Sequence, residues 1–150
     1  MRTLSLISAP VRLSETAAKR VGVGEAALRE LGPMAYARAK NGVDRFPPGT
    51  DPGLMEWFAV EQGQSDLEVM INMQKFTYGL DTTPYLARIA APTLLVWGDQ
   101  DKVVPPSYAQ IFSKAIVGKT KVKKIKSAGH MAEFDQPKAV AKAVVEFLAG

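Results

Sequence analysis

The chain has 150 residues, with 19 lysines and arginines against 15 aspartates and glutamates, one histidine and no cysteine. This length suits about one domain, and a hydrophobic fraction of 47% excludes an intrinsically disordered chain. Without cysteine there is no disulfide, thiolate nucleophile or cysteine-ligated metal, and one histidine excludes a multi-histidine metal site. We therefore expect no metal and no other cofactor.

The amino-terminal apolar run covers residues 4–9 and ends at Pro10. It is shorter than the roughly 7–15 apolar residues of a secretory signal, and no run in the chain approaches the ~20 residues that span a bilayer. The lack of cysteine fits a reducing compartment. We expect a short buried strand in a cytoplasmic protein that does not bind membranes.

Three short runs are predicted to be strands: residues 4–8, 93–97 and 122–126. The first two are continuous and apolar, which is typical of parallel strands that are covered on both faces. Apolar residues at helical spacing over 108–116 and 140–148 predict a helix after each of the last two strands, with Asp135 as the N-cap of the second helix. This alternation predicts an α/β fold.

The middle of the chain, residues 13–89, shows no convincing strand. Helical patterns over 17–40, 54–60 and 66–78 are separated by glycine and proline, most densely in the turn-rich linker 46–53. We therefore expect a core of residues 1–12 and 90–150 that is interrupted by a helical cap or lid at 13–89. A packed helical layer without a lid function is the alternative interpretation.

Five lysines between residues 119 and 126, with no acid among them, account for the positive net charge of +4. A nucleic-acid surface would need a broad basic face with arginine or aromatic side chains for stacking, and this segment has neither. We interpret it as a lysine-rich strand at a sheet edge, where charge prevents edge-to-edge pairing. We expect no nucleic-acid partner.

Asp99 and Asp101 follow the second predicted strand, and His130 follows the third. In open parallel sheets, ligands and catalytic groups gather at the carboxyl ends of the strands. A carboxylate beside the imidazole would fix its tautomer and stabilise its cationic form. The imidazole would then act as a general base near neutral pH.

Two segments carry a resemblance to a known family. Residues 91–105, with an apolar strand, Gly98-x-x-Asp101 and Pro105, closely resemble the acid-bearing strand and turn of the α/β-hydrolase family. Residues 127–137, with Gly129-His130, are similar to the histidine loop and final helix of that family. Residues 2–9 resemble the strand after the nucleophile helix. The resemblance implies a partial α/β-hydrolase fold with about three mostly parallel strands, and assigns the triad acid to Asp101, leaving Asp99 as a turn residue.

The nucleophile of that family lies in Gly-x-Ser-x-Gly on a strand-to-helix turn, and no such segment occurs in these 150 residues. The nearest match, residues 63–67, lacks the last glycine and follows a helix, so we interpret Ser65 as a helix N-cap and place Asp66 in the first turn. The oxyanion-hole loop is absent too. The chain is therefore similar to the carboxyl-terminal half of a hydrolase.

The resemblance implies ester or acyl hydrolysis of the serine esterase, lactonase or non-haem haloperoxidase type, with Asp101 and His130 as the catalytic residues. The nucleophile would come from a missing segment or a partner chain, so we expect no appreciable activity of this chain alone. Apolar residues of the helical middle suggest a small apolar ester or acyl substrate: Trp57, Phe58, Met70, Met73 and Phe76.

Two alternatives remain. A non-catalytic truncated hydrolase would expose the edge of its first strand and act as an oligomerising or interaction module, most simply as a homo-oligomer. The segment 22–27 matches the dinucleotide pattern G-x-G-x-x-A, but a strand must precede that pattern. A helix is predicted at residues 15–20 instead, so we do not expect a dinucleotide cofactor.

Overall fold

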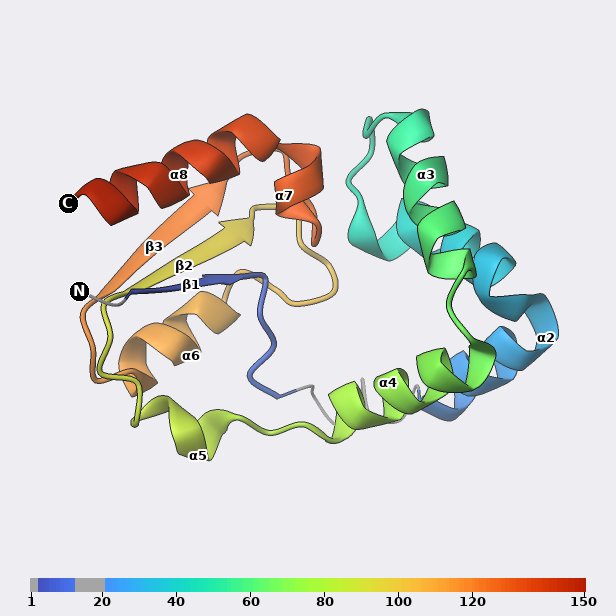
Figure 1. Ribbon diagram of the computed structural model, residues 1–150, viewed down its shortest axis with the longest axis horizontal. Coiled ribbons are helices and arrows are strands. Elements are labelled where there is room, and N and C mark those ends of the chain that lie inside the picture. The colour runs from blue at the N-terminus through green and yellow to red at the C-terminus, as the bar shows by residue number, and fades with distance from the viewer. Residues whose placement is uncertain (1–2, 13–20) are drawn as a thin grey trace.

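A computed structural model describes residues 3–12 and 21–150 (Figure 1). Strands β1 (Leu4–Ile7), β2 (Thr93–Gly98) and β3 (Thr120–Ile125) form one parallel sheet in the order β1-β2-β3. The prediction of a short parallel α/β sheet is confirmed. The helix that was expected at residues 15–20 lies outside the described residues.

The central strand β2 is buried along its whole length because helices cover both of its faces. Leu95 and Trp97 pack against α6 (Tyr108–Ala115), whereas Val96 on the opposite face packs against α8 (Pro137–Ala149). Figure 1 shows these two helices on opposite sides of the sheet. A continuous apolar sequence is what a strand covered on both faces requires.

Strand β3 carries most of the basic segment. Among the described residues it pairs with β2 alone, and Lys121, Lys123 and Lys124 are exposed. Charged side chains along an open edge oppose pairing with another sheet. The structure thus places these lysines where the edge-strand interpretation expects them.

Four helices between β1 and β2 form what we call the helical layer. Its members are α2 (Val21–Lys40), the π-helix η1 (Asn41–Arg45), α3 (Pro52–Gly63) and α4 (Leu67–Gly79). Leu28, Tyr36 and Ile71 form a small apolar core of its own. The carboxyl ends of the strands point toward this layer in Figure 1. The layer thus lies over the edge of the sheet at which we expect the site.

The long helix α2 is kinked. Gly32 has a φ of 75°, outside the helical region, and Pro33 follows it. A residue before proline is disfavoured in the helical conformation, and glycine adopts positive φ at little cost. The glycine–proline pair therefore explains the change of direction. Residues 22–27 lie within α2.

The short helix α5 (Thr83–Leu86) belongs spatially to the sheet. Leu86 and Ile89 pack in the same apolar cluster as Trp97 and Phe112. This part of the predicted insertion 13–89 therefore contacts the core, and the division at residue 89 stays a prediction. No helix in the described part of the chain has both the length and the apolar character needed to cross a membrane.

Two predicted helix caps were wrong. The N-cap of α4 is Asp66, whose carboxylate accepts from the backbone N–H groups of Glu68 and Val69, so Ser65 lies outside the helix. Asp135 is the last residue of α7 (Ala132–Asp135), and the N-cap position of α8 is Gln136. A separate turn of helix before α8 carries Asp135 away from the capping position.

Candidate active site

The loop after β2 holds a carboxylate in a fixed position. The side chain of Asp101 is fully buried. Its Oδ1 accepts from the backbone N–H of Val103 at 2.9 Å and of Val104 at 2.8 Å. The Trp97 indole N–H donates to the carbonyl of Val104 at 3.0 Å, which ties the loop to the buried strand. One oxygen of Asp101 is thus used by the loop, and Oδ2 is left for another partner.

That partner is the only histidine in the chain. Nδ1 of His130 lies 3.1 Å from Oδ2 of Asp101. The carboxylate is an acceptor, so Nδ1 must carry the proton and Nε2 keeps its lone pair in the neutral ring. The His130 side chain is 21% exposed, and Nε2 has no hydrogen-bond partner among the described residues. The structure therefore brings together the two residues that the sequence predicted as a catalytic pair.

Backbone contacts hold the loops of the acid and the histidine together. Backbone N–H groups of Asp99 and Gln100 donate to the carbonyls of Ile125 and Ala128, each at 2.9 Å. A β-carbon on Gly98 would overlap the carbonyl oxygens of Ala128 and Gly129, so only glycine allows this close approach. The carboxylate of Asp99 accepts weakly from the Ala128 N–H at 3.4 Å. Asp99 thus has a loop contact, as a turn residue would.

The helical layer also fixes the histidine loop. The backbone N–H of His130 donates to the carbonyl of Arg45, at the end of η1, with a distance of 2.8 Å. A β-carbon on Gly129 would overlap that same carbonyl oxygen. The layer is therefore in backbone contact with the candidate catalytic residue.

Asp135 is a residue of this site that the sequence analysis assigned to a helix cap. Its Oδ2 accepts from the Gly129 N–H at 2.7 Å, and its Oδ1 accepts from the Thr50 hydroxyl at 2.9 Å. Burial raises the pKa of Asp135 above its ordinary value of 3.8, although both hydrogen bonds act in the opposite direction. Asp135 thus connects the histidine loop to the segment before α3.

We predict opposite outcomes for two substitutions at this position. Asp135→Ala leaves the Gly129 N–H without its acceptor and should lower the free energy of unfolding by about 1–3 kcal/mol. Asp135→Asn keeps an acceptor for Gly129 and donates to Thr50, so it should be no less stable than the native chain near neutral pH. Urea unfolding measures both effects.

The pH dependence provides the control. The pKa of Asp135 is raised in the folded chain, so the folded state holds the proton more tightly than the unfolded state. The contribution of Asp135 to stability must therefore fall as pH rises from 3.8 through the raised pKa. Asp135→Asn should remove that fall. If the difference in free energy of unfolding between the native chain and Asp135→Asn does not change with pH over this range, the raised pKa of Asp135 is contradicted.

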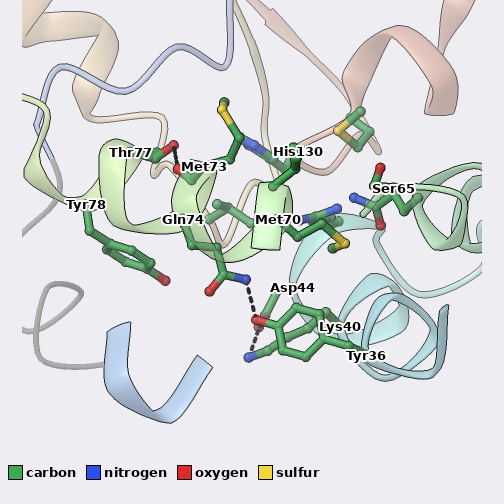
Figure 2. Close-up of a pocket in the computed structure, with 15 residues that line it drawn as sticks. Tyr36, Lys40, Asp44, Ser65, Met70, Met73, Gln74, Thr77, Tyr78 and His130 are labelled. Carbon is green, nitrogen blue, oxygen red and sulfur yellow. Dashed lines mark hydrogen bonds and ion pairs between the residues drawn. The ribbon is translucent and has the colours of Figure 1, made fainter. Parts of the chain in front are cut away.

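A pocket of about 530 Å³ opens beside the imidazole, between the loops that follow β2 and β3 and the helical layer. Figure 2 shows Met70 and Met73 near His130, and Tyr36 farther from it, beside Lys40. Most of the pocket wall comes from η1, α2 and α4, with Gln62 at the carboxyl-terminal end of α3. The lining residues are Tyr36, Lys40, Asp44, Arg45, Gln62, Ser65, Val69, Met70, Met73, Gln74, Thr77, Tyr78, Val103, His130 and Met131.

The five apolar residues expected to bind substrate divide into two groups. Met70 and Met73 line the pocket. Trp57 and Phe58 do not line it but pack on Phe134 of α7, each with ring centroids 5.7 Å apart. Phe76 is 63% exposed and also lies outside the lining. The aromatic pair of α3 thus joins the helical layer to the histidine loop.

Ser65 lines the same pocket as His130. It lies between α3 and α4, not on the strand-to-helix turn that positions a hydrolase nucleophile. Within the described residues, no group of three or more His, Asp or Glu side chains is arranged to hold a metal ion.

The sequence model of the alpha/beta hydrolase fold family matches residues 62–137, just over half of the chain. The chain belongs to the α/β-hydrolase family. The matched region includes both Asp101 and His130. The three parallel strands with flanking helices are therefore part of an α/β-hydrolase fold, as the resemblance in the sequence implied.

Individual relatives match only in part. Over 62 residues, 41% of this chain, the sequence is 39% identical to monoacylglycerol lipase ABHD6 of Rattus norvegicus and covers 18% of that protein. A hydrolase from Pseudomonas aeruginosa shares the fold with a TM-score of 0.84, at 24% identity, over 99% of this chain and 56% of that one. A thermophilic esterase from Thermogutta terrifontis shares the fold with a TM-score of 0.83, at 22% identity, over 98% of this chain and 55% of that one. This α/β-hydrolase chain thus spans little more than half of these solved structures.

Proposed function

We propose that the chain supplies the general base and its orienting acid to a serine hydrolase that cleaves carboxylic esters. The observation that carries this proposal is the 3.1 Å contact between His130 Nδ1 and the buried carboxylate of Asp101. Family membership and the lipase and esterase relatives support the same class of reaction.

The reaction follows from the free lone pair on Nε2. His130 accepts the proton of a serine hydroxyl as its oxygen attacks the ester carbonyl, and the carboxylate of Asp101 stabilises the resulting imidazolium. His130 then gives this proton to the departing alkoxide, which leaves an acyl-enzyme and a free alcohol. A water molecule attacks the acyl carbon in the same way and releases the acid.

The serine belongs to another segment in this proposal. No Gly-x-Ser-x-Gly occurs in the 150 residues, and Ser65 precedes a helix that follows another helix. Members of a triad act as a unit, so the loss of the nucleophile removes most of the rate advantage. We therefore predict no measurable hydrolysis of p-nitrophenyl butyrate by this chain alone.

Complementation tests the proposal. The chain is co-expressed with the remaining part of the Thermogutta terrifontis esterase, which the family pattern expects to contain the nucleophile turn. We expect hydrolysis by the pair and none by either half. His130→Ala in this chain should abolish it, whereas the matched variant Ser65→Ala should retain it. Hydrolysis by the 150-residue chain alone, or hydrolysis that survives His130→Ala, would contradict the proposal.

A second candidate function rests on the edge of the sheet. The outer edge of β1 is unpaired among the described residues, and its apolar residues Leu4, Leu6 and Ile7 are only partly buried. Such an edge recruits another strand. A truncated hydrolase that self-associates through β1 would be a dimer or larger by light scattering, and a monomer would contradict this alternative.

A further inference from the structure

Arg45 lies where it can influence what the pocket accepts. It is the last residue of η1 and lines the pocket together with His130. Its own carbonyl receives the backbone N–H of His130 at 2.8 Å. One backbone hydrogen bond therefore connects the segments that carry the guanidinium and the imidazole, and it fixes the two backbones relative to each other.

The guanidinium has no carboxylate partner among the described residues, although nearby cations do. Lys40 pairs with Asp44 at 3.4 Å, and Arg38 pairs with Glu56. No side-chain hydrogen bond of Arg45 is found among the described residues, and its guanidinium carbon lies 5.9 Å from the centroid of the Phe58 ring. A ring face satisfies none of the N–H groups on the edge of the guanidinium, which remain available to an acceptor.

The surroundings make this cation costly without an acceptor. Arg45 is partly buried, and burial lowers the pKa of its guanidinium, although Tyr36, Asp44 and Tyr78 act in the opposite direction. Arginine nevertheless stays charged in proteins. A desolvated charge is stabilised when a hydrogen-bonded counter-ion enters, so an anionic ligand should bind well here.

The other charged residues of the pocket indicate the charge of the anion. Asp44 is held by Lys40, so Arg45 is the one pocket cation without a described ion-pair partner. Its planar fork matches the geometry of a carboxylate or a phosphate, but its single positive charge balances a carboxylate and leaves a phosphate dianion with one negative charge unpaired. Met70 and Met73 supply apolar wall beside it.

We propose that Arg45 binds a carboxylate group of the substrate, and that the preferred substrates are esters with a free carboxylate, such as hemiesters of dicarboxylic acids. This inference rests on the proposed function, because it assigns the pocket beside His130 to the substrate. The apolar acyl or alkyl part of the ester lies against the methionines, and the carboxylate lies at Arg45.

Binding by the chain alone tests the inference without any need for a nucleophile. Glutarate, a dicarboxylate, and the neutral glutaramide are titrated into the native chain by calorimetry. We expect glutarate to bind and glutaramide to bind at least about tenfold more weakly. Arg45→Gln should weaken glutarate binding by about tenfold or more, and Arg45→Lys should weaken it less. The matched variant Arg88→Gln removes an exposed arginine outside the pocket lining and should bind like the native chain.

Equal affinity of the native chain and Arg45→Gln for glutarate would overturn the inference. So would an equal loss in Arg88→Gln, which indicates general attraction to a basic protein. Inorganic phosphate that binds more tightly than glutarate would overturn the choice of a carboxylate. Unfolding curves test whether Arg45→Gln is folded. If it is not, the comparison with the native chain is made with Arg45→Lys instead. Because the complementation assay uses a neutral ester, a failure at Arg45 is distinguishable from a failure of the proposed function.

Discussion

Asp101→Asn is expected to lower the hydrolytic rate of the complemented enzyme by about 10³–10⁴-fold. The asparagine Oδ1 can still accept from the backbone N–H groups of Val103 and Val104. Its Nδ2 then takes the place of Oδ2, 3.1 Å from Nδ1 of His130. An amide donates hydrogen bonds from nitrogen, so it binds the tautomer whose proton is on Nε2. That tautomer cannot accept the serine proton.

Asp99→Asn is the matched control for this prediction. Asp99 lies in the same loop but is exposed, and its carboxylate makes only a 3.4 Å contact with the Ala128 N–H. The hydrolytic rate of Asp99→Asn should stay within about threefold of the native rate, which corresponds to a change of less than about 0.7 kcal/mol in the activation free energy. Rates are measured as kcat/KM with p-nitrophenyl butyrate. Equal losses at the two positions would assign Asp101 a role in the loop fold alone.

Gly98→Ala is expected to give the largest loss of stability. The new β-carbon would overlap the carbonyl oxygens of Ala128 and Gly129, which are backbone atoms of the histidine loop. Backbone cannot move aside as a flexible side chain can, so the two loops must separate. We expect the free energy of unfolding to fall by about 2–4 kcal/mol, measured by urea denaturation.

Gly79→Ala provides the comparison. Gly79 ends α4, and a β-carbon there would meet no atom within 4 Å. Alanine favours the helix and reduces the freedom of the unfolded chain, so this variant should be neutral or slightly stabilising. A Gly98→Ala variant that unfolds at the same urea concentration as Gly79→Ala would show that the loops do not depend on the close approach.

The sheet and the acid–histidine pair were predictable because their signals are local. Apolar runs define β1 and β2, and parallel strands place their carboxyl ends at one edge. Asp101 follows β2 and His130 follows β3, which are parallel neighbours. Their approach therefore follows from the topology of the sheet and not from long-range side-chain contacts. The paired register of β2 and β3 then brings their loops together.

The other features of the site depend on contacts between distant segments. Arg45 reaches the histidine loop through a carbonyl, and a backbone hydrogen bond has no signature in side-chain pattern. Asp135 is a residue type that commonly caps helices, and it precedes Pro137 of α8. Its carboxylate instead accepts hydrogen bonds from Gly129 and Thr50. Trp57 is an aromatic residue of a type that often lines substrate pockets, yet it packs on Phe134. Aromatic and capping residues suit several environments, and tertiary packing decides between them.

The tautomer of His130 tests the central claim most directly. The chain has one histidine, so ¹⁵N NMR of the imidazole gives a single pair of ring signals. In alkaline buffer, where an ordinary imidazole is neutral, we predict a proton on Nδ1 and a bare Nε2 in the native chain, and the reverse in Asp101→Asn. A native ring protonated on Nε2 and unchanged by Asp101→Asn would contradict the account.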